Sequence, residues 1–545
     1  MENVLTSQTL WEGYDPTAEQ LDTVVIKQTE EDGVVSKHLY FTGRTFEHGK
    51  SRIYATVCYE GSSHNKPAVL VIGDYKRPIE ENVLRDFARR GFVAMSVDFA
   101  GRRDEGLHTL YPEELDYCNA DVASSMFDVT SSARETALYE YALNCRRAIT
   151  YLLDEEKANC VSVLTSLRGV YVGIIVLGVE NRVKNGVLLF GNIHRNYPEP
   201  DKDENMLGMD QDELERHIAY DTKKHKWTLG LAPQTYALQI KVPLYVINSA
   251  NSPYVDVAET SKTIYRVNAE SRLLILPTCM DYLPARYADG VIRWLEGFDA
   301  KPKSEIKSFV DESGDYCVRV LTTRPIEQTS VWYCTEAEGS ARYWTKANLV
   351  LTSNGYVAKL NLFEKQCTVA FFALFEDDVA VSTPLVIERV SASNVRKASN
   401  IIFSSASNQT LIPLAPRKTW WNVNLEPELA KGYLNLVGAK GKVLATFAIS
   451  DKSIHIDSAF TLGFDVCCKV KQQIKITAVK KFGSLNQLYS QSAEVMGTGK
   501  WERLTFDKAN FHRNDDGRQL TDEETVDLLI ISAENEFIVN NIFLV

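Results

Sequence analysis

The sequence has no long hydrophobic run and no basic leader. No apolar stretch approaches the roughly 20 residues that a membrane-spanning helix needs. The first residues, Met1 to Ser7, lack the basic region and apolar core of a signal peptide. We therefore expect a cytoplasmic protein with no membrane partner.

Paired cysteines and clusters of positive charge are also missing. The ten cysteines are scattered, several lie inside apolar runs, and no C-x-x-C spacing indicates zinc. Buried reduced thiols are typical of this pattern, so we expect no disulfide framework, no metal site and no cofactor. The formal net charge is −12 with no basic cluster to offset it, which argues against a nucleic-acid partner.

The patterning that is present predicts a multidomain chain of α/β plus all-β class. Residues 1–300 begin with alternating strands and then change to buried strands that alternate with helices, which predicts a mostly parallel central sheet with helices on both faces. A polar insertion at 193–240 is either a lid over the carboxyl ends of the strands or a solvent-exposed helical segment with no role at the site. Short alternating strands predict a β-sandwich at 301–392 and a second all-β unit at 393–545.

One stretch of the α/β region has the pattern of a nucleophile elbow. The apolar run from Val161 to Leu164 turns sharply into a helix of small residues that starts at Gly169. A G-x-S-x-G elbow presents its serine at the third of five positions. Counted back from Gly169, these positions read Thr165, Ser166, Leu167, Arg168, Gly169, so the apex is Leu167, which has no nucleophile.

Histidine is missing where a hydrolase would need a general base. None of the nine histidines lies between His225 and His455, a gap that includes the turn after the last strand of the α/β region. The expected base position falls on Thr278, or on its neighbour Cys279, and neither replaces imidazole at neutral pH. The expected acid position falls on Ser252, while the nearby Asp256 matches a helix N-cap.

Residues 8–299 resemble the acetyl xylan esterase and dienelactone hydrolase branch of the α/β-hydrolases. The segments that carry the resemblance are Trp11–Pro16, Tyr40–Gly43, Val71–Asp74, Val97–Arg102, Thr109–Pro112, Ile247–Tyr254 and Cys279–Tyr282. The resemblance implies an α/β-hydrolase fold and a family that removes acyl groups, often acetyl groups from sugars. The serine, aspartate and histidine of that family fall here on Leu167, Ser252 and Thr278, so the resemblance implies a degenerate catalytic triad.

The two all-β units that follow the α/β region also resemble known folds. Residues 301–392 look like an immunoglobulin-like or fibronectin-like sandwich. Residues 395–545 resemble a jelly-roll carbohydrate-binding module through segments such as Leu462–Val466 and Trp501–Leu504, and a structural calcium in such a module is conceivable without being indicated. Trp420 and Trp421 are the candidate sugar-stacking residues, although adjacent strand residues face opposite ways, which favours one core residue and one incidental one.

Three hypotheses of function remain open. The first is a non-catalytic binding or scaffolding protein that recognises carbohydrate or an acylated sugar. The second is an active carbohydrate or carboxylic esterase in which Ser166 acts with a displaced base, His108 or His194; the simpler interpretation of these residues is that both histidines lie on surface loops and Ser166 caps the next helix. The third is a structural assembly component of unknown oligomeric state.

Overall fold

The computed structural model describes residues 4–75, 79–102, 106–119, 129, 131–195, 222–277, 280–297, 304–335, 341–406, 411–414, 419–423, 428–456, 459–483, 486–521 and 523–545. Contacts group these residues into two compact units. The first comprises 1–248, 255–273 and 290–299, and the second comprises 249–254, 274–289 and 300–545. The segments that follow two strands of the α/β region, 249–254 and 274–289, therefore belong with the C-terminal half. The predicted domain boundaries near 300 and 392 stay predictions.

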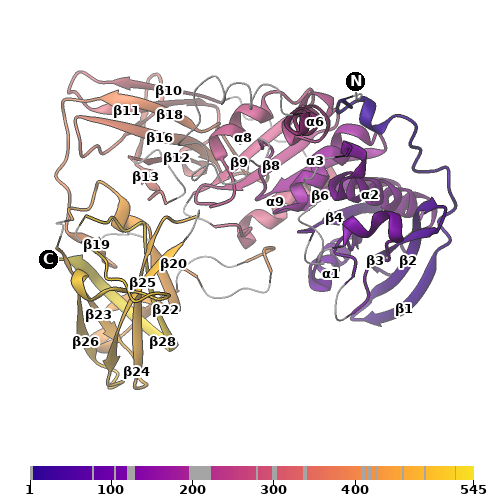
Figure 1. Ribbon diagram of the computed structural model, residues 1–545. Coiled ribbons are helices and arrows are strands. Elements are labelled where there is room, and N and C mark those ends of the chain that lie inside the picture. The colour runs from indigo at the N-terminus through magenta and orange to yellow at the C-terminus, as the bar shows by residue number, and fades with distance from the viewer. Residues whose placement is uncertain are drawn as a thin grey trace. The chain divides into compact units, whose positions relative to one another are not determined.

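A nine-stranded sheet organises the N-terminal half of the described chain (Figure 1). Its order is β1 (Val24–Glu31), β2 (Val34–Phe46), β3 (Gly49–Glu60), β5 (Val93–Val97), β4 (Pro67–Ile72), β6 (Cys160–Ser166), β7 (Val183–Leu189), β8 (Leu244–Ser249), β9 (Ser271–Leu276). The first three strands pair antiparallel at one edge, and β5, β4, β6, β7 and β8 pair parallel. This confirms the predicted edge of alternating strands beside a mostly parallel sheet.

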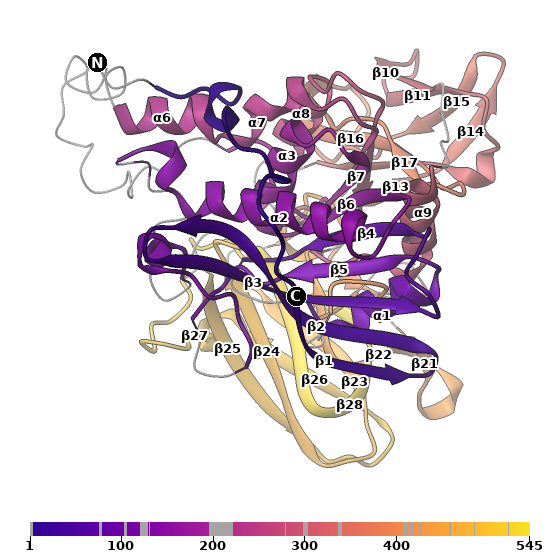
Figure 2. The same ribbon diagram turned by 90° about the vertical axis from the view of Figure 1, so that its right-hand side faces the viewer.

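The helices of this half are α1 (Glu81–Arg89), α2 (Ala137–Asp154), α3 (Gly169–Val179), α6 (Thr222–Gly230), α7 (Pro233–Tyr236), α8 (Val257–Ile264) and α9 (Ala285–Glu296). In both ribbon views α2 and α3 lie on the face of the sheet opposite α1 (Figures 1 and 2).

Two neighbouring residues of β7 show that helices cover both faces of the sheet. A Cβ on Gly186 would meet Leu177 of α3, whereas the Asn185 side-chain amide donates to the carbonyl oxygens of Trp294 and Leu295 in α9. Successive strand residues face opposite ways, so α3 and α9 pack on opposite faces. Strand β4 is buried from Ala68 to Ile72, as a central strand of such a sheet requires. The α/β class expected for this half is therefore confirmed.

The middle of the chain is a β-sandwich. One sheet has the order β10 (Ser304–Val310), β11 (Tyr316–Thr322), β15 (Gly355–Lys359), β14 (Leu349–Thr352). The other has the order β13 (Thr345–Ala347), β12 (Thr329–Cys334), β16 (Gln366–Phe375), β17 (Val381–Ser382), with β18 (Val386–Ser391) also on β16. Side chains of both sheets, such as Val318 and Phe371, share one core.

The C-terminal part is all-β, as predicted. Its strands are β19 (Ile401–Phe403), β20 (Ile412–Pro413), β21 (Glu428–Lys431), β22 (Val437–Thr446), β23 (Thr461–Cys467), β24 (Gln472–Lys480), β25 (Gln487–Val495), β26 (Trp501–Asp507), β27 (His512–Arg513) and β28 (Leu528–Leu544). The long β28 pairs with β19, β22, β23 and β24. The stacked rings of Phe464 and Phe506 lie in its core.

Candidate functional site

The turn between β6 and α3 has the backbone geometry of a nucleophile elbow, with Leu167 at its apex. Strand β6 ends at Ser166 and α3 begins at Gly169. Between them Leu167 has φ = +54°, a left-handed conformation that a residue other than glycine adopts only under constraint. The Leu167 N–H donates to the Leu189 carbonyl oxygen at 2.9 Å, which ties the apex to β7. The turn is therefore strained and held in place, and the apolar side chain of Leu167 is partly exposed.

Glycines make this turn possible. A Cβ on Gly169 would lie 2.6 Å from the Ile72 carbonyl oxygen and nearer still to that of Gly73, so α3 starts directly against the end of β4. A Cβ on Gly173 would overlap the Thr165 side chain, and one on Gly191 would lie 2.6 Å from the Leu167 carbonyl oxygen. Side chains are absent where the strand, the turn and the helix approach one another most closely.

Charged groups flank the apex. The exposed Arg168 lies 3.8 Å from Asp74, in the segment after β4, and its guanidinium lies 5.6 Å from the centre of the Tyr75 ring. One turn into α3, the Tyr171 hydroxyl accepts a hydrogen bond of 2.9 Å from Arg195. These groups can bind hydroxyl or carbonyl oxygens of a ligand beside an apolar apex, but they contain no nucleophile.

Ser166 is placed inside the protein. Its side chain is 0 % exposed, and its Oγ has no hydrogen-bond partner in the described part of the chain. The expectation that Ser166 caps α3 is wrong, because no side-chain cap is formed there. Ser166 is buried because β6 is a central strand of the sheet, and Val161 to Ser166 are all buried.

The two candidate bases lie on separate loops and neither is paired with Ser166. His108 is half-buried, and its Nδ1 lies 3.2 Å from the Gly106 carbonyl oxygen. The His194 backbone N–H donates to Asn192 Oδ1 at 3.1 Å. The hydrogen bonds of the described residues join neither imidazole to Ser166, so a displaced base requires rearrangement of these loops.

The segments after β8 and β9 place an acid, Asp281, beside Ser252. Ser252, at the expected acid position, is buried; its N–H donates to the Ser249 carbonyl oxygen, and its Oγ accepts from the Tyr254 N–H. Its hydroxyl also hydrogen-bonds Asp281, whose pKa burial raises to about 6 against the opposing effect of that bond. Thr278 and Cys279 lie outside the described residues, and so does 196–221 of the insertion.

Asp281 was missed by sequence reasoning. Its position within Cys279–Tyr282 offered a signal, since it is the only carboxyl of that turn, but its burial is a tertiary property. Asp256, by contrast, is confirmed as the N-cap of α8: its carboxylate accepts from the N–H groups of Ala258 and Glu259. Capping therefore occupies the Asp256 carboxylate.

The tryptophan pair lies in a bend rather than on a strand. Trp421 is 3 % exposed, whereas Trp420 is partly exposed, and their rings meet edge to face at 5.9 Å. The Trp420 carbonyl oxygen accepts from the Leu283 N–H, and Val423 exchanges hydrogen bonds with Leu283 and Ala285. This segment is thus held by its backbone to the segment after β9, and only Trp420 retains an exposed ring surface.

Metal clusters and membrane-spanning helices are both missing from the described part of the chain. No group of three or more His, Cys, Asp or Glu side chains in the described ranges could hold a metal ion. None of the described helices is long and apolar enough to cross a membrane.

No family model and no curated protein sequence matches the chain. Solved structures do match. Acetyl xylan esterase 1 from Thermoanaerobacterium sp. JW/SL YS485 is 12% identical over 51% of this chain and 88% of its own, with a TM-score of 0.38. Acetyl xylan esterase from Paenibacillus sp. R4 is 14% identical over 54% and 92%, also at 0.38. The dienelactone hydrolase-like promiscuous phosphotriesterase P91 from metagenomic libraries is 15% identical over 48% and 86%, at 0.31.

Strand order, parallel pairing and the strained turn after β6 together decide the fold of the N-terminal half. It is that of an α/β-hydrolase. The fold does not assign an activity, which depends on the side chains at the site.

Proposed function

We propose that this chain is a non-catalytic binding protein built on an α/β-hydrolase fold, and that it recognises an acylated carbohydrate. The observation that carries the proposal is Leu167 at the elbow apex, held at φ = +54° where acyl transfer requires a nucleophile. An apolar apex can pack against the methyl of an acetyl group, and Arg168 can bind nearby oxygens.

The second candidate is an acyl-ester hydrolase, the class of enzyme to which the acetyl xylan esterases of similar structure belong. Its motivating observation is the Ser166 hydroxyl, which lies one residue before the apex without a hydrogen-bond partner among the described residues. Catalysis would need the turn to present Ser166 and a base to approach it. A purely structural role remains the third candidate and is the outcome indicated if no ligand binds.

Calorimetric titration of the full chain with acetylated and deacetylated xylo-oligosaccharides tests the binding proposal. We expect saturable binding that favours the acetylated ligand. Leu167→Asn keeps a side chain that tolerates a positive φ but removes the apolar contact, so affinity for the acetylated ligand should fall about fivefold to tenfold. Leu238→Asn, at an exposed leucine of the same unit, is the matched control. Absence of sugar binding at millimolar concentration would refute the proposal.

A further inference from the structure

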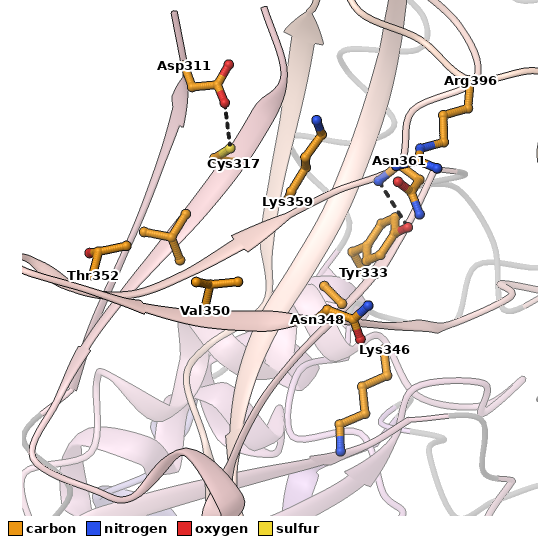
Figure 3. A pocket seen from close by; sticks show the side chains of 12 residues that line it. Asp311, Cys317, Tyr333, Lys346, Asn348, Val350, Thr352, Lys359, Asn361 and Arg396 are labelled. Carbon is orange, nitrogen blue, oxygen red and sulfur yellow. Dashed lines mark hydrogen bonds between the residues drawn. The ribbon is translucent and has the colours of Figure 1, made fainter. Parts of the chain in front are cut away.

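The β-sandwich between residues 304 and 396 contains a cavity of its own, and no elbow residue lines it (Figure 3). Its volume is about 480 Å³, within the usual range for sites that bind small molecules. Strands of both sheets line it, together with the segment that follows β18. Its polar and charged lining includes Asp311, Cys317, Tyr333, Lys346, Lys359, Asn361 and Arg396.

Positive charge predominates in this lining. Lys346, Lys359 and Arg396 contribute cations, although the whole chain carries a net charge of −12. Lys359 is paired with Asp315. Lys346 and Arg396 make no ion pair with any carboxylate of the described residues, and Arg396 is exposed. Two cations are therefore available to a ligand.

The lining also contains one carboxylate, that of Asp311, which is held by hydrogen bonds at the other end of the cavity. Asp311 Oδ1 accepts from the N–H groups of Ser313 and Asp315 at 2.9 and 3.0 Å, and Oδ2 lies 3.8 Å from the Cys317 thiol. Burial, reinforced by Asp311, raises the pKa of Cys317 to about 11, so this thiol is a weak donor rather than a nucleophile. These hydrogen bonds hold the Asp311 carboxylate at the hairpin between β10 and β11, and it forms no ion pair with Lys346 or Arg396.

Three donors converge at the cationic end. Figure 3 shows the Arg396 head group, the Asn361 side chain and the Tyr333 hydroxyl pointing toward one another. The Tyr333 oxygen accepts the Asn361 backbone N–H at 3.1 Å, and the Asn361 side chain also hydrogen-bonds this hydroxyl. Burial raises the pKa of Tyr333, so the phenol keeps its proton and remains a donor. These hydrogen bonds hold Tyr333 and Asn361 beside the Arg396 head group as a preformed set of polar groups.

We propose that this cavity binds a small ligand that bears a carboxylate group. A guanidinium, a phenolic O–H and an amide at one end match the two oxygens of a carboxylate, which Arg binds in a planar, charge-assisted arrangement. Val350 and Val357 provide an apolar wall for the carbon skeleton, and Asn348 and Thr352 can bind hydroxyl groups. The proposal goes beyond the elbow and does not depend on its function.

The test is calorimetric titration of the full chain at low ionic strength with four probes: glucuronate, acetate, inorganic phosphate and methyl glucoside. We expect saturable binding of glucuronate or acetate, and comparing the two separates a sugar acid from a simple acid. Arg396→Gln should weaken that binding at least about tenfold because it removes the charge-assisted bonds. Lys346→Gln and Tyr333→Phe should each weaken it by a smaller factor.

Arg389→Gln is the matched control, since Arg389 is an exposed arginine of the adjoining strand β18 that does not line the cavity. It removes the same charge and should leave affinity unchanged. Equal losses in Arg389→Gln and Arg396→Gln would show a general charge effect and overturn the proposal. Binding of phosphate alone, or of none of the anions, would also overturn it.

Discussion

Gly169→Ala should destabilise the N-terminal half by about 3 kcal/mol, at the upper end of the usual cost of overpacking. The new Cβ would lie 2.6 Å from the Ile72 carbonyl oxygen and closer to that of Gly73. Both obstacles are backbone atoms of the segment that ends β4, so neither can move aside by a rotamer change. The melting temperature of the full chain, followed by circular dichroism, should fall by several degrees.

Gly230→Ala provides the comparison for this substitution. Gly230 is also helical, but its added Cβ would meet its nearest neighbour, the Leu5 carbonyl oxygen, at 3.1 Å. That contact needs a shift of only a few tenths of an ångström, so the loss should be much smaller. Equal melting temperatures for the two variants would contradict the tight approach of α3 to β4.

Asp281→Asn should raise stability by about 3 kcal/mol at pH 8 and leave it nearly unchanged at pH 4. Burial raises the pKa of Asp281 from its ordinary 3.8 to about 6 in the folded protein. The folded state thus holds this proton more tightly than the unfolded state does. The wild type therefore loses stability as pH rises from about 4 to 6, by about 1.4 kcal/mol for each tenfold fall in proton concentration, and the loss levels off above pH 6.

The asparagine variant avoids that cost because its side chain does not ionise. Chemical denaturation at pH 4, 6 and 8 measures the difference between variant and wild type, which cancels the effect of other titrating groups. Asp32→Asn, in the exposed turn between β1 and β2, is the control for replacing a carboxylate by an amide. A constant difference at all three pH values would mean that Asp281 is not buried as described.

Much of the fold could be predicted from the sequence, because the period of the hydrophobic pattern and the residue types at turns are local properties. Buried runs predicted β4 and β6, and the small-residue stretch predicted α3. The position of Leu167 at the apex followed from counting back from Gly169, and its positive φ agrees with that count. The capping role of Asp256 was likewise readable from its place before a helical run.

The side-chain environments did not follow from the sequence, because contacts between distant segments determine them. Whether Ser166 would cap a helix or lie buried without a cap depends on how β6 enters the sheet. Asp281 acquires its raised pKa only through burial beside Ser252, 29 positions earlier in the chain. Trp420 and Trp421 were expected on a strand, but their backbone is held instead in a bend against Leu283.

Hydrolysis of an activated acetyl ester by the purified full chain, measured beside Ser166→Ala, tests the central claim most directly. With Leu167 at the apex and Ser166 buried, both proteins should give the same rate, equal to the background without protein. The substitution removes one buried hydroxyl that has no partner among the described residues, so folding should be retained and can be checked by circular dichroism. Turnover well above background that disappears in Ser166→Ala would contradict the account and establish an esterase.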